Sequence, residues 1–235
     1  CKSLQKSFNS SDVAKPKPPL IKVHGGAGSG KSKLINDIAN WAEYFLRPLF
    51  PQNPDQPIII KVAPTGKAAS LIQGMTLHAA FHFKFSNEYL SLSDKLRNTM
   101  RKDLSKLQIV IVDEMSMVKS DLLYQLQRRL QEVKQSEDDF GGIAVLLFGD
   151  LMQLQPVRAN WIFESPRDPK FARSHAVRPL WDLFDPYELR QNHRQGSDKV
   201  YADILNRVRF GQQTQADIDR LKARLGVPVP STALY

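Results

Sequence analysis

Short apolar runs alternate with longer amphipathic segments along much of the chain. Four runs are rich in β-branched residues and do not alternate with polar positions, as is typical of strands buried on both faces of a parallel sheet. The strands are expected at 20–23, 58–62, 109–112 and 143–148, with amphipathic helices at 33–46 and 122–133. This alternation predicts an α/β fold with a doubly wound, mostly parallel sheet and helices on both faces. Ligands are then expected at the carboxyl ends of the strands.

The remaining segments suggest how the chain is organised. Residues 83–106 are richer in polar positions and predict an inserted helix, and a further helix is expected at 215–225. Residues 1–19, with the sequence KPKPP near their end, are expected to form a leader or linker. The main domain is expected at 20–226, and 227–235 are interpreted as the start of a truncated second domain. Because Cys1 stands where a full protein would carry Met, we interpret the chain as a fragment.

Composition and charge narrow the class of protein. A hydrophobic share of 42% and a charged share of 24% are ordinary for a soluble globular protein. The single cysteine excludes an intramolecular disulfide and a zinc site built from cysteines. No apolar run approaches the roughly 18 residues of a membrane span, so no membrane partner is expected. The net charge of +9 favours nucleic acid, but the basic residues are scattered and a generally basic surface fits equally well.

The segment 25–32, GGAGSGKS, satisfies the phosphate-binding pattern G-x-x-x-x-G-K-[ST]. Its glycines let backbone N–H groups turn toward the phosphates, and the following helix points its positive end at them. Lys31 can reach the β- and γ-phosphates of ATP, while the hydroxyl of Ser32 can ligate Mg²⁺. The predicted nucleotide-binding residues are Gly25, Gly26, Ala27, Gly28, Ser29, Gly30, Lys31 and Ser32. An apolar run enters this loop and an amphipathic segment leaves it, which favours a P-loop over an incidental glycine-rich turn.

An acidic pair, Asp113-Glu114, follows the apolar run at 109–112. At the end of a strand, Asp113 can hold Mg²⁺ through its hydration shell, and Glu114 can orient or activate the attacking water. The alternative is a solvated loop or a helix cap. Glu114 also bears on the class of enzyme, because a P-loop kinase that phosphorylates a small molecule needs no water-activating carboxylate.

A second polar segment, GDLMQLQPV at 149–157, follows the fourth predicted strand. Gln153 can distinguish ATP from ADP by a hydrogen bond to the terminal phosphate. The alternative is a tight turn in which Asp150 caps the backbone. The spacing does not choose between the two.

Six blocks occur in the order GGAGSGKS, APTGKAAS, GMTLHAAF, IVIVDEMSM, FGGIAVLLFGDLMQLQPV and LRQNHRQ. Together they resemble the motifs of superfamily 1 helicases, and most of all the PIF-type (petite integration frequency) DNA helicases and the related helicase portions of Helitron transposases. The resemblance covers residues 20 to about 211. It implies a RecA-like P-loop NTPase domain at 20–226, which uses ATP and Mg²⁺ to translocate 5′ to 3′ on single-stranded DNA.

The same resemblance implies a role for individual residues. The catalytic set is Lys31, Asp113, Glu114, Gln153 and Arg194, the last as an arginine finger within the chain. The residues that touch DNA are Thr65, Gly66, Lys67, Thr76 and His78. Threonine and lysine suit phosphate, and a histidine can stack on a base, although a buried, hydrogen-bonded histidine is the alternative for His78. Phe81 and Phe83 flank this region and are expected in the core, with stacking on a base as the alternative.

The resemblance also implies partners and a location. They are single-stranded DNA and a second RecA-like domain of the same protein, inside the cell, in the nucleus or mitochondrion. Three alternatives remain open. They are an ATP-driven switch that remodels nucleic acid without processive unwinding, the helicase part of a rolling-circle transposase, and the small-molecule kinase. Gln5 is the one upstream candidate for adenine recognition, and its surroundings match the family poorly.

Overall fold

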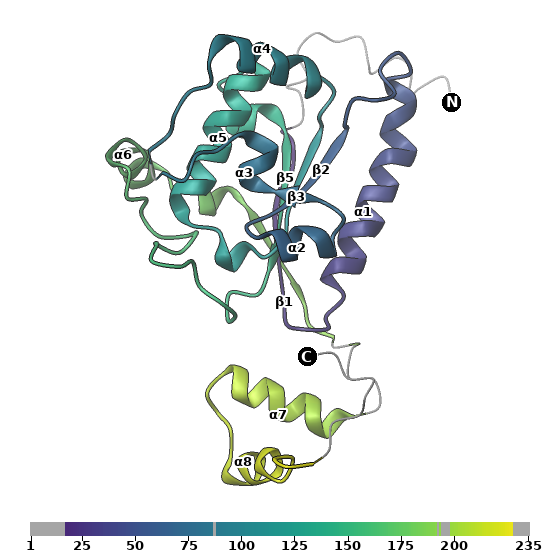
Figure 1. Cartoon of the computed structure of the whole chain (residues 1–235), viewed down its shortest axis with the longest axis vertical. Helices are drawn as coiled ribbons and strands as arrows, with labels where there is room; N and C mark the ends of the chain where they lie inside the picture. The colour runs from purple at the N-terminus through teal and green to yellow at the C-terminus, as the bar shows by residue number, and fades with distance from the viewer. Residues whose placement is uncertain (1–16, 87, 192, 194–197, 228–235) are drawn as a thin grey trace, which may run out of the picture.

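The computed structural model describes residues 17–86, 88–191, 193 and 198–227. Six strands in them form one sheet with the order β3-β2-β4-β5-β1-β6, and every neighbouring pair is parallel (Figure 1). The strands are β1 (Leu20–Gly25), β2 (Ile59–Ala63), β3 (Met75–Thr76), β4 (Ile109–Val112), β5 (Ala144–Gly149) and β6 (Asp185–Leu189). The four predicted strands are confirmed, and so is the doubly wound α/β class.

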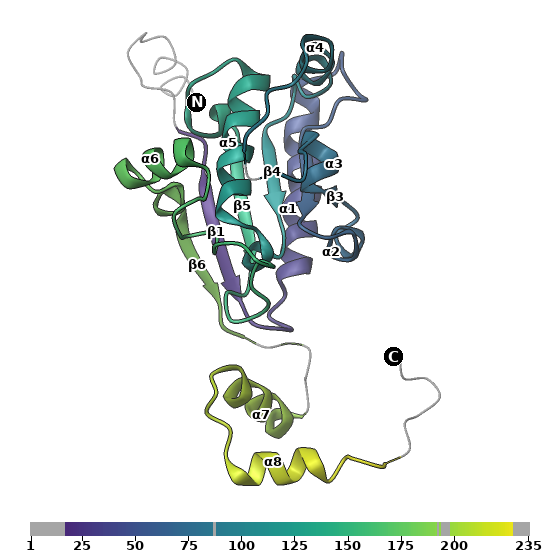
Figure 2. The same ribbon diagram turned by 60° about the vertical axis from the view of Figure 1, so that its left-hand side comes forward.

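Helices cover both faces of this sheet (Figure 2). The helices are α1 (Lys31–Leu46), α2 (Gly66–Leu71), α3 (Leu77–Phe81), α4 (Asp94–Asp103), α5 (Ser120–Lys134), α6 (Pro169–Val177), α7 (Lys199–Arg209) and α8 (Gln215–Lys222). Short 3-10 helices lie at Arg47–Leu49, Met115–Met117, Asp139–Gly142 and Leu180–Leu183. None of the helices in the described ranges is long and apolar enough to cross a membrane.

The central strands are buried on both sides, which explains why their sequences do not alternate. In β4, Val110 and Val112 point into a large core that includes residues of α3, α4, α5 and α6. Ile109 and Ile111 point the other way, into a smaller core with residues of α1 and α2. Successive side chains of a strand point to opposite faces, so one apolar run supplies both cores.

Two strands carry no apolar run and were not predicted. β6 lies at one edge of the sheet, where it pairs with β1 alone, and its residues are largely exposed. β3 has only two residues and lies at the opposite edge. An edge strand with one solvated face gains little from apolar residues, so its sequence gives only a weak signal.

Some predicted helices differ from those observed. The inserted helix expected at 83–106 is wrong in extent, because only Asp94–Asp103 is helical. The preceding loop is held by polar contacts instead: Arg129, 1% exposed, donates to the carbonyl oxygen of Leu90 at 2.9 Å. The stripe expected on α1 also ends early, since Trp41 and Phe45 are 58% and 52% exposed. The last helix ends at Lys222 rather than 225.

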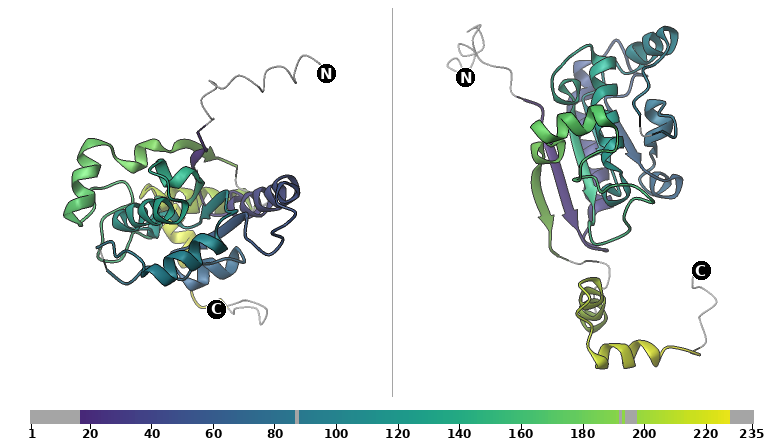
Figure 3. Two further views of the ribbon diagram at one scale, coloured as in Figure 1. Left: turned by 90° about the horizontal axis from the view of Figure 1, so that it is seen from above. Right: turned by 90° about the vertical axis from the view of Figure 1, so that its left-hand side faces the viewer.

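The helices α7 and α8 form a pair beyond the carboxyl edge of the sheet (Figure 3). Arg207 of α7 donates two hydrogen bonds, of 2.7 and 2.6 Å, to the carboxylate of Asp217 in α8. This pairing keeps the pKa of Asp217 well below its usual range. Thr214 and Asp217 also form a capping box at the start of α8, so one carboxylate both caps a helix and joins two.

Candidate functional site

The segment at 25–30 connects β1 to α1 in a tight loop. Gly28 and Gly30 have φ angles of 78° and 92°, a left-handed conformation that favours glycine. At Gly25 a side chain would collide with the Ser29 hydroxyl, because an added Cβ would lie 2.4 Å from it. Among the residues that the structure describes, no side chain caps the first turn of α1, which leaves its backbone N–H groups suited to an anion. Strand, loop and helix therefore have the arrangement that the P-loop prediction requires.

Lys31, the first residue of α1, folds back over this loop. Its ammonium donates to the carbonyl oxygens of the first two glycines at 2.6 and 3.0 Å. Burial lowers the pKa of Lys31, and the charges of Asp150, Glu114 and Asp113 partly oppose that shift. The loop thus holds a half-buried cation that faces three carboxylates from neighbouring strands. Such a cation suits the phosphates of a nucleotide.

The predicted acidic pair lies at the end of β4. Asp113 is 6% exposed, and its carboxylate accepts a hydrogen bond of 2.9 Å from the backbone N–H of Glu114. Burial raises the pKa of both carboxyl groups, and the charge of Asp113 raises that of Glu114 further. Mg²⁺ takes oxygen ligands, few of them from protein, and the Asp113 carboxylate with the exposed Ser32 hydroxyl is a donor set of that kind.

The turn after β5 is the capped turn that one interpretation of its sequence predicted. The carboxylate of Asp150, 1% exposed, accepts hydrogen bonds from the backbone N–H of Met152 at 3.0 Å and from the side chain of Gln153 at 3.3 Å. Asp150 therefore caps the turn. Gln153 lines a pocket of about 320 Å³ that P-loop residues also line. β5 pairs with both β1 and β4, so the loops that follow these three strands meet at the carboxyl end of the sheet.

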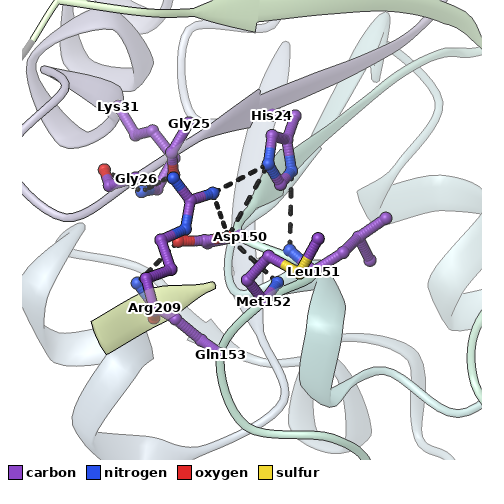
Figure 4. Close-up of polar contacts among 9 residues, drawn as sticks. All are labelled: His24, Gly25, Gly26, Lys31, Asp150, Leu151, Met152, Gln153 and Arg209. Atoms are coloured by element: carbon purple, nitrogen blue, oxygen red, sulfur yellow. Dashed lines mark hydrogen bonds and ion pairs between the residues drawn. The ribbon is translucent and has the colours of Figure 1, made fainter. Parts of the chain in front are cut away.

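Arg209, at the end of α7, also lies in this site, and no sequence signal indicated it. Its Nη2 atom donates to Asp150 at 2.7 Å and lies 3.0 Å from Nε2 of His24 (Figure 4). Its guanidinium covers the P-loop so closely that a Cβ added at Gly26 would lie 3.1 Å from Nη1. The contact joins residues 59 positions apart and depends on where α7 packs.

The predicted arginine finger, Arg194, lies outside the described residues. Its neighbour His193 is described, and the backbone N–H of His193 donates to the carbonyl oxygen of Gly28 at 2.8 Å. His193 therefore lies beside the P-loop. Gln5, the upstream adenine candidate, also lies outside the described residues.

The residues predicted to touch DNA follow β2 and β3, which are neighbours in the sheet. Thr65 and Thr76 start α2 and α3, and each hydroxyl accepts a hydrogen bond of 3.2 Å from a backbone N–H in the first turn. A hydroxyl that accepts in this way can still donate its hydrogen to another group. Gly66 and Lys67 are exposed beside Thr65. The five residues thus lie at the carboxyl ends of two adjacent strands.

His78 is half-buried, and its ring stacks on Phe85 with centroids 4.7 Å apart and an interplanar angle of 18°. Burial lowers the pKa of His78, and the nearby charge of Lys119 lowers it further. Phe81 and Phe83 are buried in the core, as predicted. Phe85 is 95% exposed, and the sequence reasoning did not identify it. The alternation of phenylalanines at 81, 83 and 85 was the available signal, but it indicates no difference in exposure.

A P-loop after β1, an acidic pair after β4 and a polar turn after β5, the strand between them, define a RecA-like P-loop NTPase domain. A family model described as PIF1-like helicase matches residues 3–218. The chain belongs to this family.

Similar proteins agree with this assignment. The ATP-dependent DNA helicase PIF1 of Emericella nidulans is 30% identical over 203 residues, which are 84% of this chain and 25% of that protein. The helicase Pif1 of Bdellovibrio bacteriovorus is 31% identical over 204 residues, 81% of this chain and 40% of the relative. A crystal structure of Bacteroides Pif1 with ADP-AlF3 and single-stranded DNA has a TM-score of 0.67 at 25% identity, and the match covers 99% of this chain and 51% of that one. The chain thus spans about a quarter to two fifths of these curated relatives.

Arg209→Ala should destabilise the protein. The substitution removes a charged hydrogen-bond partner from Asp150, which is nearly buried, and this should cost about 1–3 kcal/mol. Thermal unfolding measures the loss, and Arg220→Ala, at an exposed position of α8, is the matched control. In the double variant with Asp150→Asn the two losses should be less than additive. Strict additivity would mean that the two side chains do not interact.

Proposed function

We propose that this chain is the ATP-hydrolysing motor domain of a DNA helicase that translocates 5′ to 3′ on single-stranded DNA. The observation that carries the proposal is the position of Glu114 next to Asp113, with both charges near the P-loop lysine. A P-loop alone binds phosphate, whereas a carboxylate beside the metal site can activate water for hydrolysis. The named relatives, which are ATP-dependent DNA helicases, support the same function.

Each residue of the nucleotide site then has a role. Lys31 and the N–H groups of the loop hold the phosphates, and Ser32 and Asp113 hold Mg²⁺, which neutralises phosphate charge when bound. Glu114 takes a proton from the attacking water, and its raised pKa brings it closer to neutral pH, where a general base works best. Gln153 senses the terminal phosphate from the turn after β5.

Arg194 completes the nucleotide site as the arginine finger, which stabilises the charge of the transition state. The hydrogen bond between its sequence neighbour His193 and Gly28 of the P-loop supports this role.

Single-stranded DNA is proposed to cross the ends of β2 and β3. Lys67 and the hydroxyl hydrogens of Thr65 and Thr76 suit phosphate oxygens, Gly66 leaves room for the backbone, and His78 suits a base. In the described part of the chain, no atom outside its own helical turn lies within 4 Å of a Cβ added at Gly66. One backbone hydrogen bond connects the nucleotide site to the proposed DNA path. The backbone N–H of Asp113 donates to the carbonyl oxygen of Val62 at 2.9 Å, and the loop that begins at Pro64 starts two residues after Val62.

A second RecA-like domain of the same protein is the proposed partner for stepping along DNA. The greater length of the relatives supports it. Because the substrate is DNA, we expect the protein to act inside the cell, in the nucleus or mitochondrion.

Lys31→Ala should abolish DNA-stimulated ATP hydrolysis, and in the full-length protein it should abolish unwinding, because it removes the ammonium proposed to hold the β- and γ-phosphates. ATP turnover with and without single-stranded DNA is the measurement. Lys33→Ala is the matched control, since Lys33 is exposed in the same helix and pairs with Asp37. A Lys31→Ala protein that hydrolyses ATP at the wild-type rate would exclude the proposed site. The chain alone should bind nucleotide, hydrolyse it slowly and unwind nothing.

Lys67→Ala should weaken binding to single-stranded DNA and lower its dependence on salt. A lysine that neutralises one phosphate contributes about 0.7 to the slope of log affinity against log salt concentration. Fluorescence anisotropy with a labelled oligothymidine at several salt concentrations measures both quantities. Lys170→Ala, at an exposed position of α6, should leave the slope unchanged. Equal slopes for all three proteins would contradict a phosphate contact by Lys67.

A further inference from the structure

One exposed aromatic side chain lies directly beside the proposed DNA path. Phe85 is 95% exposed, the largest fraction among the exposed large hydrophobic residues that the structure describes. It lies four residues after α3, in the loop that leads toward α4. A ring left in water gives up the free energy of burial, so its position is costly unless something covers it.

The Phe85 ring ends a chain of side-chain contacts that begins in the core. The guanidinium of Arg129 lies 5.5 Å from the centroid of Phe83, which is buried. Phe83 meets the ring of His78 edge to face, with centroids 6.3 Å apart. His78 then lies flat against Phe85. One face of the Phe85 ring is thus supported from below by an aromatic ring that is itself packed on the core.

The backbone on both sides of Phe85 is tied to the body of the domain. The backbone N–H of Phe83 donates to the carbonyl oxygen of His78 at 3.1 Å. The carbonyl oxygen of Ser86 accepts hydrogen bonds of 3.1 Å from the side chains of Lys119 and Gln125. These contacts hold the ring in place before a ligand arrives, which lowers the entropy cost of binding.

The surroundings indicate what kind of ligand would cover the ring. Lys84 is exposed next to Phe85, Lys119 lies beneath the loop, and Glu88 is the acidic neighbour. A flat apolar face among cations suits a planar group that is attached to phosphate, and a nucleobase in a single strand is such a group. Thr76 and His78, both expected to contact DNA, belong to the same helical turn that supports the ring.

We propose that Phe85, supported by His78, stacks on a base of single-stranded DNA. The proposal rests on the proposed function, because it requires a strand that crosses the ends of β2 and β3. Every base has a flat face, so this contact holds the strand without selecting its sequence. Phe85 is a binding residue for the nucleic acid and has no part in the chemistry at the P-loop.

The test compares DNA with and without bases. Affinity for a labelled oligothymidine, and for an oligonucleotide of the same length made of abasic sites, is measured by fluorescence anisotropy. Phe85→Ala should weaken binding to oligothymidine about five-fold or more. It should change binding to the abasic strand less than about two-fold and leave the salt slope unaltered, because the phosphates are untouched. Tyr44→Ala, at a position 75% exposed on α1, should leave both affinities unchanged.

A second variant keeps the ring. Phe85→Trp should bind oligothymidine as the wild type does, and its added tryptophan fluorescence should be quenched by oligothymidine and not by the abasic strand. Since Phe85 is exposed, neither variant should lower the unfolding temperature, which excludes misfolding as the cause of a loss.

The outcomes separate the two proposals. If Lys67→Ala weakens binding and Phe85→Ala does not, the stacking proposal is wrong and the DNA path stands. An equal loss on both strands with Phe85→Ala also overturns stacking, because the side chain would then act on the backbone or the fold. If neither Lys67→Ala nor Phe85→Ala changes affinity, the DNA path itself is wrong.

Discussion

The functional site is organised around a half-buried lysine that is held among carboxylates at the carboxyl end of a parallel sheet. The Lys31 ammonium is bound to two carbonyl oxygens of its own loop and faces Asp113, Glu114 and Asp150. Removing such charges from water is unfavourable, and it raises the pKa of the Asp113 and Glu114 carboxyl groups. The arrangement is therefore maintained by the packing around it, above all by β4 and β5, which are buried on both faces.

Because all the strands are parallel, the loops that follow them lie at the carboxyl end of the sheet, and this end has two regions. The loops after β1, β4 and β5 form the nucleotide site, and those after β2 and β3 carry the residues proposed to meet DNA. The strands β2 and β4 are hydrogen-bonded neighbours, with Val62 paired to Val112. Asp113 therefore lies one strand away from the start of the proposed DNA path. Through this short connection, nucleotide binding at Asp113 can alter the affinity of the domain for single-stranded DNA.

Much of the nucleotide site could be predicted from the sequence, because its determinants are local. A strand, a glycine loop and a helix follow one another along the chain, and the acidic pair directly follows a fully apolar run. The exposed edge strand β6 could not be predicted, because it needs no apolar residues. The contact of Arg209 with Asp150 was missed for a different reason: it depends on the packing of α7. Phe85 looked like its neighbours Phe81 and Phe83, and only the fold distinguishes the exposed ring from the buried ones.

The measurement that tests the account most directly is ATP binding and turnover in Glu114→Gln, at saturating single-stranded DNA. The substitution keeps the size of the side chain and removes its basicity, while Lys31 and the loop remain. We expect wild-type affinity for ATP and a turnover reduced by about 100-fold or more, the usual loss when a general base is removed. Turnover equal to that of the wild type would show that Glu114 does not activate water, and would contradict the central claim that this edge of the sheet hydrolyses ATP.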